Sequence, residues 1–364
     1  MPAVVWCLFV LLAGLMVGSF LNVLVARLPY EKSIVWPGSR CFSCYRKIRF
    51  LDNLPIVGYL RLEGRCRFCG AAFSSRYLWV ELGTGLAFLG LFVLEVMVNP
   101  AGLPGVRYTA DGLTANPSPA AVGLFVYHAF LLSMLIAAAV IDAEHRIIPP
   151  LIPYTGAIVG LVGAALMPWP WPHDPSLAQL PIGTTWILPE QAGKVPVGVQ
   201  PWPFWLPLPE FAAAATWKLG LLNAVVGALA GSLVVRWIKW LFEVGFGKEA
   251  LGLGDADLLM MAGAFLGWQI AVLSLFVGAF AALLVFKLPR MVVVKDVDNE
   301  LPFGPGLAVG VAVTWLAWPW LGPKLQFPLF DLTAMALMVI VVSVGMLAAG
   351  LMLRRGEVVE NAHP

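Results

Sequence analysis

Residues 3–26 read AVVWCLFVLLAGLMVGSFLNVLVA, an unbroken apolar run without a charged side chain. As an α-helix this run is about 36 Å long, enough to cross the ~30 Å hydrocarbon core of a bilayer. Its first basic residue, Arg27, follows the run instead of preceding it. This order predicts a first membrane helix with its N-terminus outside the cell, and not a cleaved secretion signal.

Similar apolar runs recur along the chain. Hydrophobic residues make up 60% of the 364 positions and charged residues only 12%, whereas soluble domains have about 45–50% and about 25%. The sequence therefore predicts an all-α polytopic membrane protein with about eight to nine membrane helices. A net charge of +2 gives no reason to expect a nucleic-acid partner. Besides 3–26, the expected spans are 79–98, 119–141, 151–168, 217–241, 256–286 (crossing twice), 304–321 and 332–352.

The basic residues predict which segments face the cytoplasm. Segment 27–78 holds ten of the 23 Lys and Arg residues, so we expect it to be cytoplasmic. Stretch 256–286 is too long for one span. If it crosses the membrane twice, with a break near Gly267, the basic residues after position 286 lie on the cytoplasmic side. The predicted division is 1–26, the first membrane helix; 27–78, a small cytoplasmic zinc-binding domain; 79–353, a membrane core; and 354–364, a cytoplasmic tail.

Some polar and irregular features lie inside the predicted core. Residues 168–216 contain eleven prolines and five tryptophans, which excludes a regular helix and favours a loop on the outer membrane surface. Charged side chains within spans need a partner or an exit to water. We expect Glu81, near the cytoplasmic end of its span, to reach the interface, and His128 to pack with one polar contact.

Four cysteines form two pairs, Cys41-x-x-Cys44 and Cys66-x-x-Cys69, separated by 21 residues. Two such pairs suit a tetrahedral Zn²⁺ site, and four thiolate ligands leave no open position, so the metal would have a structural role. Two disulfides, or four reduced thiols without a metal, are the alternatives, although a cytoplasmic location disfavours stable disulfides. We expect the fifth cysteine, Cys7, to be a packing residue of the first helix.

Two aspartates stand at the ends of apolar runs, Asp142 after Leu131–Ile141 and Asp255 before the next run. The predicted topology puts both on the cytoplasmic face. Two carboxylates brought close share a proton near neutral pH, and the pair can then activate water and polarise a peptide carbonyl. Each aspartate alone also fits a helix cap or a solvated interfacial charge, and these alternatives stay open.

The sequence around the second aspartate is Gly252-Leu-Gly-Asp255. Gly252 and Gly254 would let an irregular backbone approach an extended substrate, as an active-site loop. Asp257 competes with Asp255 for the catalytic role, although its position at the start of a helix also suits capping.

These motifs resemble those of one family, the bacterial prepilin peptidases, which form the type IV leader peptidase/N-methyltransferase group of GxGD membrane aspartic proteases. The resemblance covers most of the chain. It rests on Gly18-Ser-Phe-Leu-Asn-Val23, Arg27-Leu-Pro29, the four cysteines, Leu51-Asp-Asn-Leu-Pro55, Ser75-Arg-Tyr77, Val80-Glu-Leu82, Asp142 with Ile148-Pro149, Gly247-Lys-Glu249, Gly252-Leu-Gly-Asp255 and Pro302-Phe-Gly-Pro305.

The resemblance implies a specific activity. Such enzymes sit in the bacterial inner membrane and cut the basic leader of type IV prepilins, or of type II secretion pseudopilins, after a glycine on the cytoplasmic side. Many then methylate the new N-terminus with S-adenosylmethionine, and their cysteine-bearing domain resembles 27–78. By position, the resemblance makes Asp142 and Asp255 the catalytic residues, and it assigns no residue to the methyl donor.

Two features depart from the family pattern. The family usually has Lys where this chain has Asp257, and the 168–216 loop is atypical. Two other functions stay open at this point: an ion-coupled transporter that uses its buried acids as ion sites, and a non-enzymatic assembly component that docks through the cysteine domain.

Overall fold

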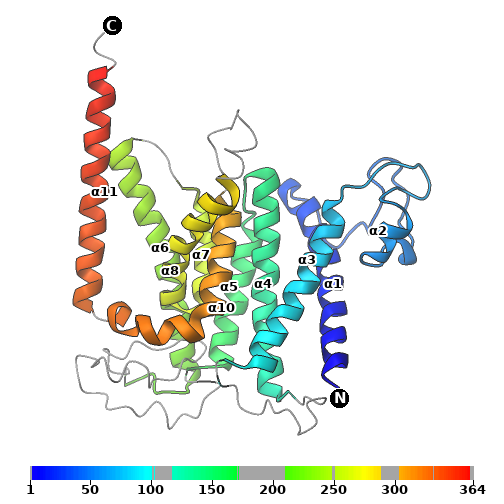
Figure 1. Ribbon diagram of the computed structural model, residues 1–364, viewed down its shortest axis with the longest axis horizontal. Coiled ribbons are helices and arrows are strands. Elements are labelled where there is room, and N and C mark those ends of the chain that lie inside the picture. Colours follow the sequence, from blue (N-terminus) through cyan, green and yellow to red (C-terminus); the bar gives the residue numbers. More distant parts are fainter. Residues whose placement is uncertain are drawn as a thin grey trace. The chain divides into compact units, whose positions relative to one another are not determined.

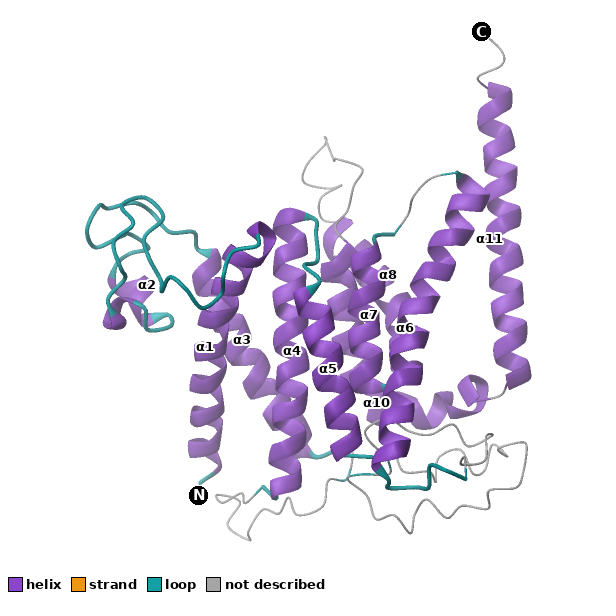
Figure 2. Ribbon diagram, turned by 180° about the vertical axis from the view of Figure 1, so that it is seen from behind, coloured by secondary structure: helices purple, strands orange, loops and turns teal. Residues whose placement is uncertain are grey.

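The computed structural model describes residues 2–100, 102, 117–169, 171, 210–247, 251–287, 303–330 and 332–360. Over these residues the chain is helical, with two isolated β-bridges and no strand, as Figure 2 shows. The all-α fold class is therefore confirmed. The chain divides into two compact units, Met1–Ile152 and Pro153–Pro364, which are described separately below.

The N-terminal unit is built on three long helices that pack side by side (Figure 1). They are α1 (Ala3–Arg27), α3 (Arg76–Phe92), which continues as a π-helix over Val93–Val98, and α4 (Pro119–His145). Between α1 and α3 the chain leaves the bundle and forms a small loop-rich domain. Its short helices are η1 (Leu28–Tyr30), η2 (Phe50–Asp52) and α2 (Val57–Arg61).

Glycines let α1 and α3 approach closely. Gly14 and Gly18 are one helical turn apart on α1, and a Cβ on Gly18 would lie 2.8 Å from the Cα of Glu81. A Cβ on Gly14 would lie 2.9 Å from the Cα of Gly85. This spacing of small residues is a common basis for helix packing in membranes, where lipid leaves little hydrophobic force between helices.

The second unit contains the remaining helices and starts within α5. They are α5 (Leu151–Leu166), α6 (Trp217–Phe246), α7 (Leu253–Leu266), α8 (Trp268–Ala281) with a π-helical continuation over Ala282–Lys287, α10 (Phe303–Phe330) and α11 (Leu332–Glu360). The most extensive helix–helix contact of this unit joins α6 to α7. There, a Cβ on Gly227 would overlap the carbonyl group of Gly263, and a Cβ on Gly263 would overlap that of Gly227.

Six helices of the described chain are long and apolar enough to cross a membrane. They are Ala3–Tyr30, Arg76–Val98, Pro119–His145, Trp217–Phe246, Phe303–Gly322 and Thr333–Met352. Leu151–Leu166 and Trp268–Leu284 are shorter apolar helices. The chain is therefore a polytopic membrane protein, in agreement with the sequence.

The predicted break in 256–286 is confirmed. Gly267, with φ of 85°, ends α7 and precedes α8. A glycine is well suited to that position because L side chains rarely adopt such a backbone conformation. The predicted loop 168–216 lies mostly outside the described residues, and the proposed domain boundaries stay predictions.

Two ionisable residues inside the N-terminal helices, His128 and Glu81, have polar partners. His128 Nδ1 lies 2.6 Å from Glu95 Oε1, which confirms that this packed histidine makes a polar contact. The expectation that Glu81 reaches the interface is wrong. Glu81 is 8% exposed, and its Oε2 accepts a hydrogen bond from the backbone N–H of Ile56 at 2.7 Å. The loop-rich domain supplies a local donor, so this carboxylate does not need to reach water.

The α6–α7 crossing leads to a first prediction. Gly227→Ala should destabilise the purified protein by about 1–3 kcal/mol, because overpacking forces two helix backbones apart. Thermal unfolding in detergent measures the effect. Gly345→Ala on α11 is the matched control, since a Cβ there meets no atom within 4 Å. Equal melting temperatures for the two variants would contradict the crossing.

Candidate functional site

The two Cys-x-x-Cys segments fold into a matched pair of loops. Each is closed by a β-bridge, Arg40 to Lys47 in the first and Arg65 to Ala72 in the second. In each, the carbonyl of the first cysteine accepts the N–H of the residue four positions later, Tyr45 or Gly70. Both of those residues have positive φ, 57° and 71°. The repeated geometry turns the two sulfurs of each loop toward one point.

The four sulfurs lie together, all within 4.8 Å of one another. Cys41 Sγ is 3.7 Å from Cys69 Sγ, and Cys44 Sγ is 4.0 Å from Cys66 Sγ. Tetrahedral thiolates with metal–sulfur bonds of about 2.3 Å place their sulfurs about 3.8 Å apart. A disulfide needs about 2.05 Å, and all five cysteines are free. The cluster therefore fits one metal ion and does not fit two disulfides.

The electrostatics of the cluster agree with a cation at its centre. Hydrogen bonds from the backbone N–H groups of Cys69 and Phe68 lower the pKa of Cys66 to about 6. The Arg46 backbone N–H lowers the pKa of Cys44, but burial and three neighbouring sulfurs raise it to about 11. Four thiolates at this spacing repel one another unless a positive ion lies between them.

The cysteine domain is braced by an ion pair. Asp52 accepts hydrogen bonds from Arg67 Nε at 2.7 Å and from Nη2 at 2.5 Å. This bidentate contact joins η2 to the second cysteine loop and holds the pKa of Asp52 below its usual value.

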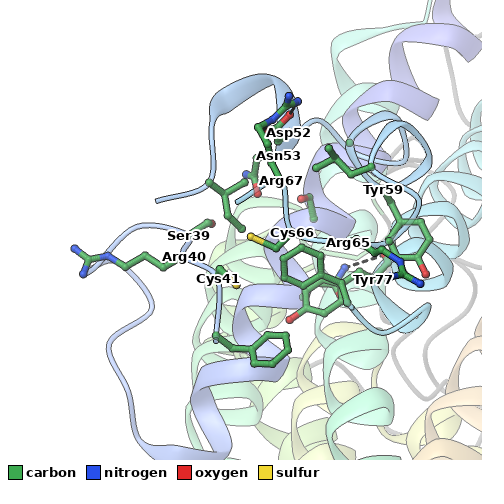
Figure 3. A pocket seen from close by; sticks show the side chains of 18 of the residues that line it. Ser39, Arg40, Cys41, Asp52, Asn53, Tyr59, Arg65, Cys66, Arg67 and Tyr77 are labelled. Carbon is green, nitrogen blue, oxygen red and sulfur yellow. Dashed lines mark hydrogen bonds and ion pairs between the residues drawn. The ribbon is translucent and has the colours of Figure 1, made fainter. Parts of the chain in front are cut away.

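A cavity of about 220 Å³ lies between this domain and the ends of α1 and α3. Figure 3 shows side chains that line it.

Asp142 lies in the last turn of α4 in the N-terminal unit and is 7% exposed. The helix ends at His145. The next residue, Arg146, takes a left-handed conformation with φ of 56° and donates its N–H to the Asp142 carbonyl at 2.9 Å. Glu144 forms an ion pair with Arg76 at the start of α3. This end of α4 is therefore held against α3.

Asp255 lies in the first turn of α7 in the second unit and is 6% exposed. Its Oδ2 accepts a hydrogen bond at 3.2 Å from the N–H of Gly252, the residue before the helix. Gly254 lies inside this first turn. The capping contact predicted for Asp257 is thus made by Asp255. Asp257 instead faces Arg236 of α6 at 3.4 Å, and this cation offsets the extra negative charge at position 257.

The predicted site residues fall into two groups. The structure brings Cys41, Cys44, Cys66 and Cys69 together. Asp142 and Asp255 belong to different units, and their catalytic pairing stays a prediction. Asn22 and Glu81, which line the cavity, were not predicted as site residues. The sequence does contain a signal for both residues: each is a polar side chain within an apolar span, and such side chains often have a functional role in membrane proteins.

Comparisons with known proteins match two stretches of this chain, one in each unit. Residues 12–94 match the bacterial peptidase A24 N-terminal domain, and residues 197–286 match the type IV leader peptidase family. A prepilin leader peptidase/N-methyltransferase of Klebsiella pneumoniae is 32% identical over 283 residues, which cover 76% of this chain and 92% of that protein. This chain belongs to the type IV leader peptidase family.

Other relatives of the same name extend the match. The protein of Dickeya chrysanthemi is 30% identical over 85% of this chain and 92% of its own length. That of Pseudomonas putida is 30% identical over 83% of this chain and 88% of its own length. No solved structure gives a significant match.

Family membership decides between the functions left open by the sequence. A member of a leader peptidase family is an enzyme, so the transporter and the assembly component are not favoured. The four cysteines lie inside the first matched stretch, and Asp255 lies inside the second. Asp142 lies between the two stretches, so its role rests on its position in the motif and in the fold.

Proposed function

We propose that this protein is a membrane aspartic endopeptidase that removes the basic leader of type IV prepilins or type II secretion pseudopilins after a glycine. The similarity to prepilin leader peptidase/N-methyltransferases over most of both chains carries the proposal. The helices support it, because a pilin-type substrate presents an apolar segment within the bilayer and a cationic leader outside it. An enzyme of membrane helices meets the junction between the two.

The proposed location is the bacterial inner membrane, with the active site facing the cytoplasm. The basic residues of 27–78 support this orientation through the positive-inside rule. A leader that is still cytoplasmic then reaches the enzyme before the pilin is assembled.

The proposed catalytic residues are Asp142 and Asp255. Each is a buried carboxylate at the end of an apolar helix. In an aspartic peptidase one carboxylate takes a proton from water while the protonated partner polarises the scissile carbonyl. The water oxygen adds to the carbonyl carbon and gives a tetrahedral intermediate. The peptide C–N bond then breaks as the leaving nitrogen receives a proton from a carboxyl group of the pair. Gly252 and Gly254 precede Asp255 with no side chain to block an extended substrate.

We propose Zn²⁺ as the structural ion of the four-cysteine cluster. Four sulfur ligands select a thiophilic ion, and the sulfur separations suit zinc–sulfur bonds. The ion would link the two loops of a domain that has few other buried contacts. All four cysteines would be used as its ligands, so the ion would have no open position for a substrate.

We further propose that the enzyme N-methylates the new N-terminal residue with S-adenosylmethionine. The relatives are named for this second activity as well as for the first. The partners implied by both activities are prepilin or pseudopilin substrates and the lipid bilayer.

The catalytic assignment gives a second prediction. Asp142→Asn and Asp255→Asn should each lower cleavage of a prepilin leader peptide by at least about a hundredfold, because a neutral amide cannot act as general base. Asn at position 255 keeps an acceptor for the Gly252 N–H, so the helix start is preserved. Mass spectrometry of the peptide products measures cleavage by the purified full chain.

The matched control for this series is Asp257→Asn. It also removes one carboxylate near the start of α7, but it breaks only a partly exposed contact with Arg236, worth about 0–1 kcal/mol. We expect cleavage within about threefold of wild type. A strong loss in Asp257→Asn together with activity in Asp255→Asn would transfer the catalytic role to Asp257.

The zinc proposal gives a third prediction. The purified full chain should hold one zinc ion, measured by elemental mass spectrometry, and Cys66→Ser should lose it because a serine hydroxyl replaces a buried thiolate. Cys7→Ser is the control, since Cys7 lies in α1, its sulfur contacts Met97 Sδ at 3.7 Å, and it is not one of the four clustered cysteines. Equal zinc content in both variants would contradict the site.

A further inference from the structure

An ion pair joins the first residue of α3 to the last turn of α4. Arg76 Nη1 donates to Glu144 Oε2, and Glu144 lies two positions after the proposed catalytic residue Asp142. Both side chains of the pair are partly exposed, at 20% and 34%. A partly exposed ion pair is worth only about 0–1 kcal/mol, so stability alone is a weak reason for the contact.

The two charges of this pair lie at the unfavourable ends of their helices. Arg76 is the first residue of α3, where the unpaired backbone N–H groups carry partial positive charge. Glu144 lies in the last turn of α4, where the unpaired carbonyl groups carry partial negative charge. Each charge in such a position costs about 0.3–1 kcal/mol. The exchanged arrangement would suit both helices, and departures from such local rules are expected at functional sites.

A second contact reaches the same turn of α4. The ring of Tyr30 lies edge-on to the ring of His145, with centroids 5.6 Å apart and planes at 81°. Tyr30 is the last residue of η1, where the chain leaves α1 for the four-cysteine domain, and Arg76 is where the chain returns to α3. The last turn of α4 is therefore held by both connections between the membrane helices and the four-cysteine domain.

Aromatic rings connect Arg76 with the four-cysteine cluster. The Arg76 guanidinium lies 4.9 Å from the centroid of the Tyr77 ring, and this ring meets that of Phe73 edge-on at 6.4 Å. Phe73 in turn meets Phe42, which directly follows Cys41, at 6.0 Å. Tyr77 and Cys41 line the same cavity (Figure 3). A continuous series of packed side chains thus runs from the cluster to the end of α4.

Backbone contacts hold this series in place. The N–H of Phe73 donates to the carbonyl of Gly64 at 2.6 Å, next to the β-bridge that closes the second cysteine loop. The carbonyl of Tyr77 accepts a hydrogen bond from Asn22 Nδ2 of α1 at 3.1 Å. The first turn of α3 is therefore fixed by the cysteine loop on one side and by α1 on the other.

We propose that Arg76 is a positioning residue for the peptidase, which links the ordered four-cysteine domain to the end of α4 and so fixes the position of Asp142. Arg76 acts through Glu144 and not on the substrate. The inference rests on the proposed catalytic role of Asp142 and gives the four-cysteine domain a part in cleavage. A displacement of about 1 Å costs about a hundredfold in rate, so a weak contact controls turnover without controlling folding.

The kinetics of leader-peptide cleavage test the link. In the purified full chain, Arg76→Gln and Glu144→Gln should each lower kcat at least about tenfold and leave KM within about twofold of wild type. The melting temperature of Glu144→Gln should stay within about 3 °C of wild type, because the lost ion pair and the relieved helix-end charge are each worth about 1 kcal/mol or less. A role in folding alone would instead lower kcat and the melting temperature together.

The exchanged pair separates the contact from the charges themselves. Arg76→Glu combined with Glu144→Arg restores an ion pair and suits both helix ends, so kcat should recover at least about fivefold over either single Gln variant. A kcat that stays at the level of the single variants would overturn the ion pair as the link. Glu243→Gln is the matched control, because Glu243 is 40% exposed and pairs with Lys239 at 3.5 Å within α6. Its kcat should stay within about twofold of wild type.

Hydrogen–deuterium exchange tests the link without reference to cleavage. The backbone amides of residues 139–146 should exchange at least about fivefold faster in full-length Arg76→Gln than in wild type. Stripping Zn²⁺ from the loaded wild-type chain with a chelator should speed exchange of the same amides, and it should have no further effect in Arg76→Gln, where the link is already cut. Equal exchange in the two loaded proteins, or an equal chelator effect in both, would overturn the route through Arg76.

The outcomes separate this inference from the proposed function. A wild-type protein that cleaves the leader peptide, with unchanged kcat in both Gln variants, overturns the positioning role and leaves the peptidase proposal intact. A wild-type protein that does not cleave the peptide, but whose residues 139–146 exchange faster in Arg76→Gln, contradicts the peptidase proposal and supports the link from the four-cysteine domain to α4.

Discussion

The absence of water inside a bilayer is the constraint on which this structure depends. A backbone that crosses lipid must satisfy its N–H and C=O groups internally, so each spanning segment is a helix. Lipid tails are as apolar as leucine, and apolar side chains alone give neighbouring helices little reason to associate. Close backbone approach supplies the attraction instead. Gly18 against Glu81 in the first unit, and Gly227 against Gly263 in the second, show this directly.

The segment between α1 and α3 is under a different constraint. It lies outside the long apolar helices, contains only short helical turns, and has few buried apolar side chains. In such a short segment, the free energy gained from a hydrophobic core does not offset the conformational entropy lost on folding. Four converging sulfurs and the Asp52–Arg67 ion pair provide the missing cross-links. Once ordered, the domain donates the backbone N–H of Ile56 to the Glu81 carboxylate. It also forms one side of the cavity.

Polar groups in the helical part are few, and the structure gives several of them a defined neighbour. Glu95 meets His128, Glu144 meets Arg76, and Asp257 faces Arg236. These pairs lower the cost of keeping charge near lipid. The pairing of Asp257 also bears on the departure from the family pattern, because Arg236 supplies a positive charge close to where the family usually has lysine. The acidic residue at 257 therefore need not change the net charge around Asp255.

The sequence by itself determined the helical membrane fold, the break at Gly267 and the grouping of the four cysteines. Each is a local property: uninterrupted apolar length, one residue with unusual backbone freedom, and two short repeats with metal-ligand spacing. The tertiary structure decided the burial of Glu81, the capping role of Asp255 and the cavity around Asn22. These depend on which atoms of distant segments meet, as when the Ile56 N–H reaches a carboxylate 25 positions away. No pattern along one chain encodes such a contact, because it arises only when separate helices and loops pack together.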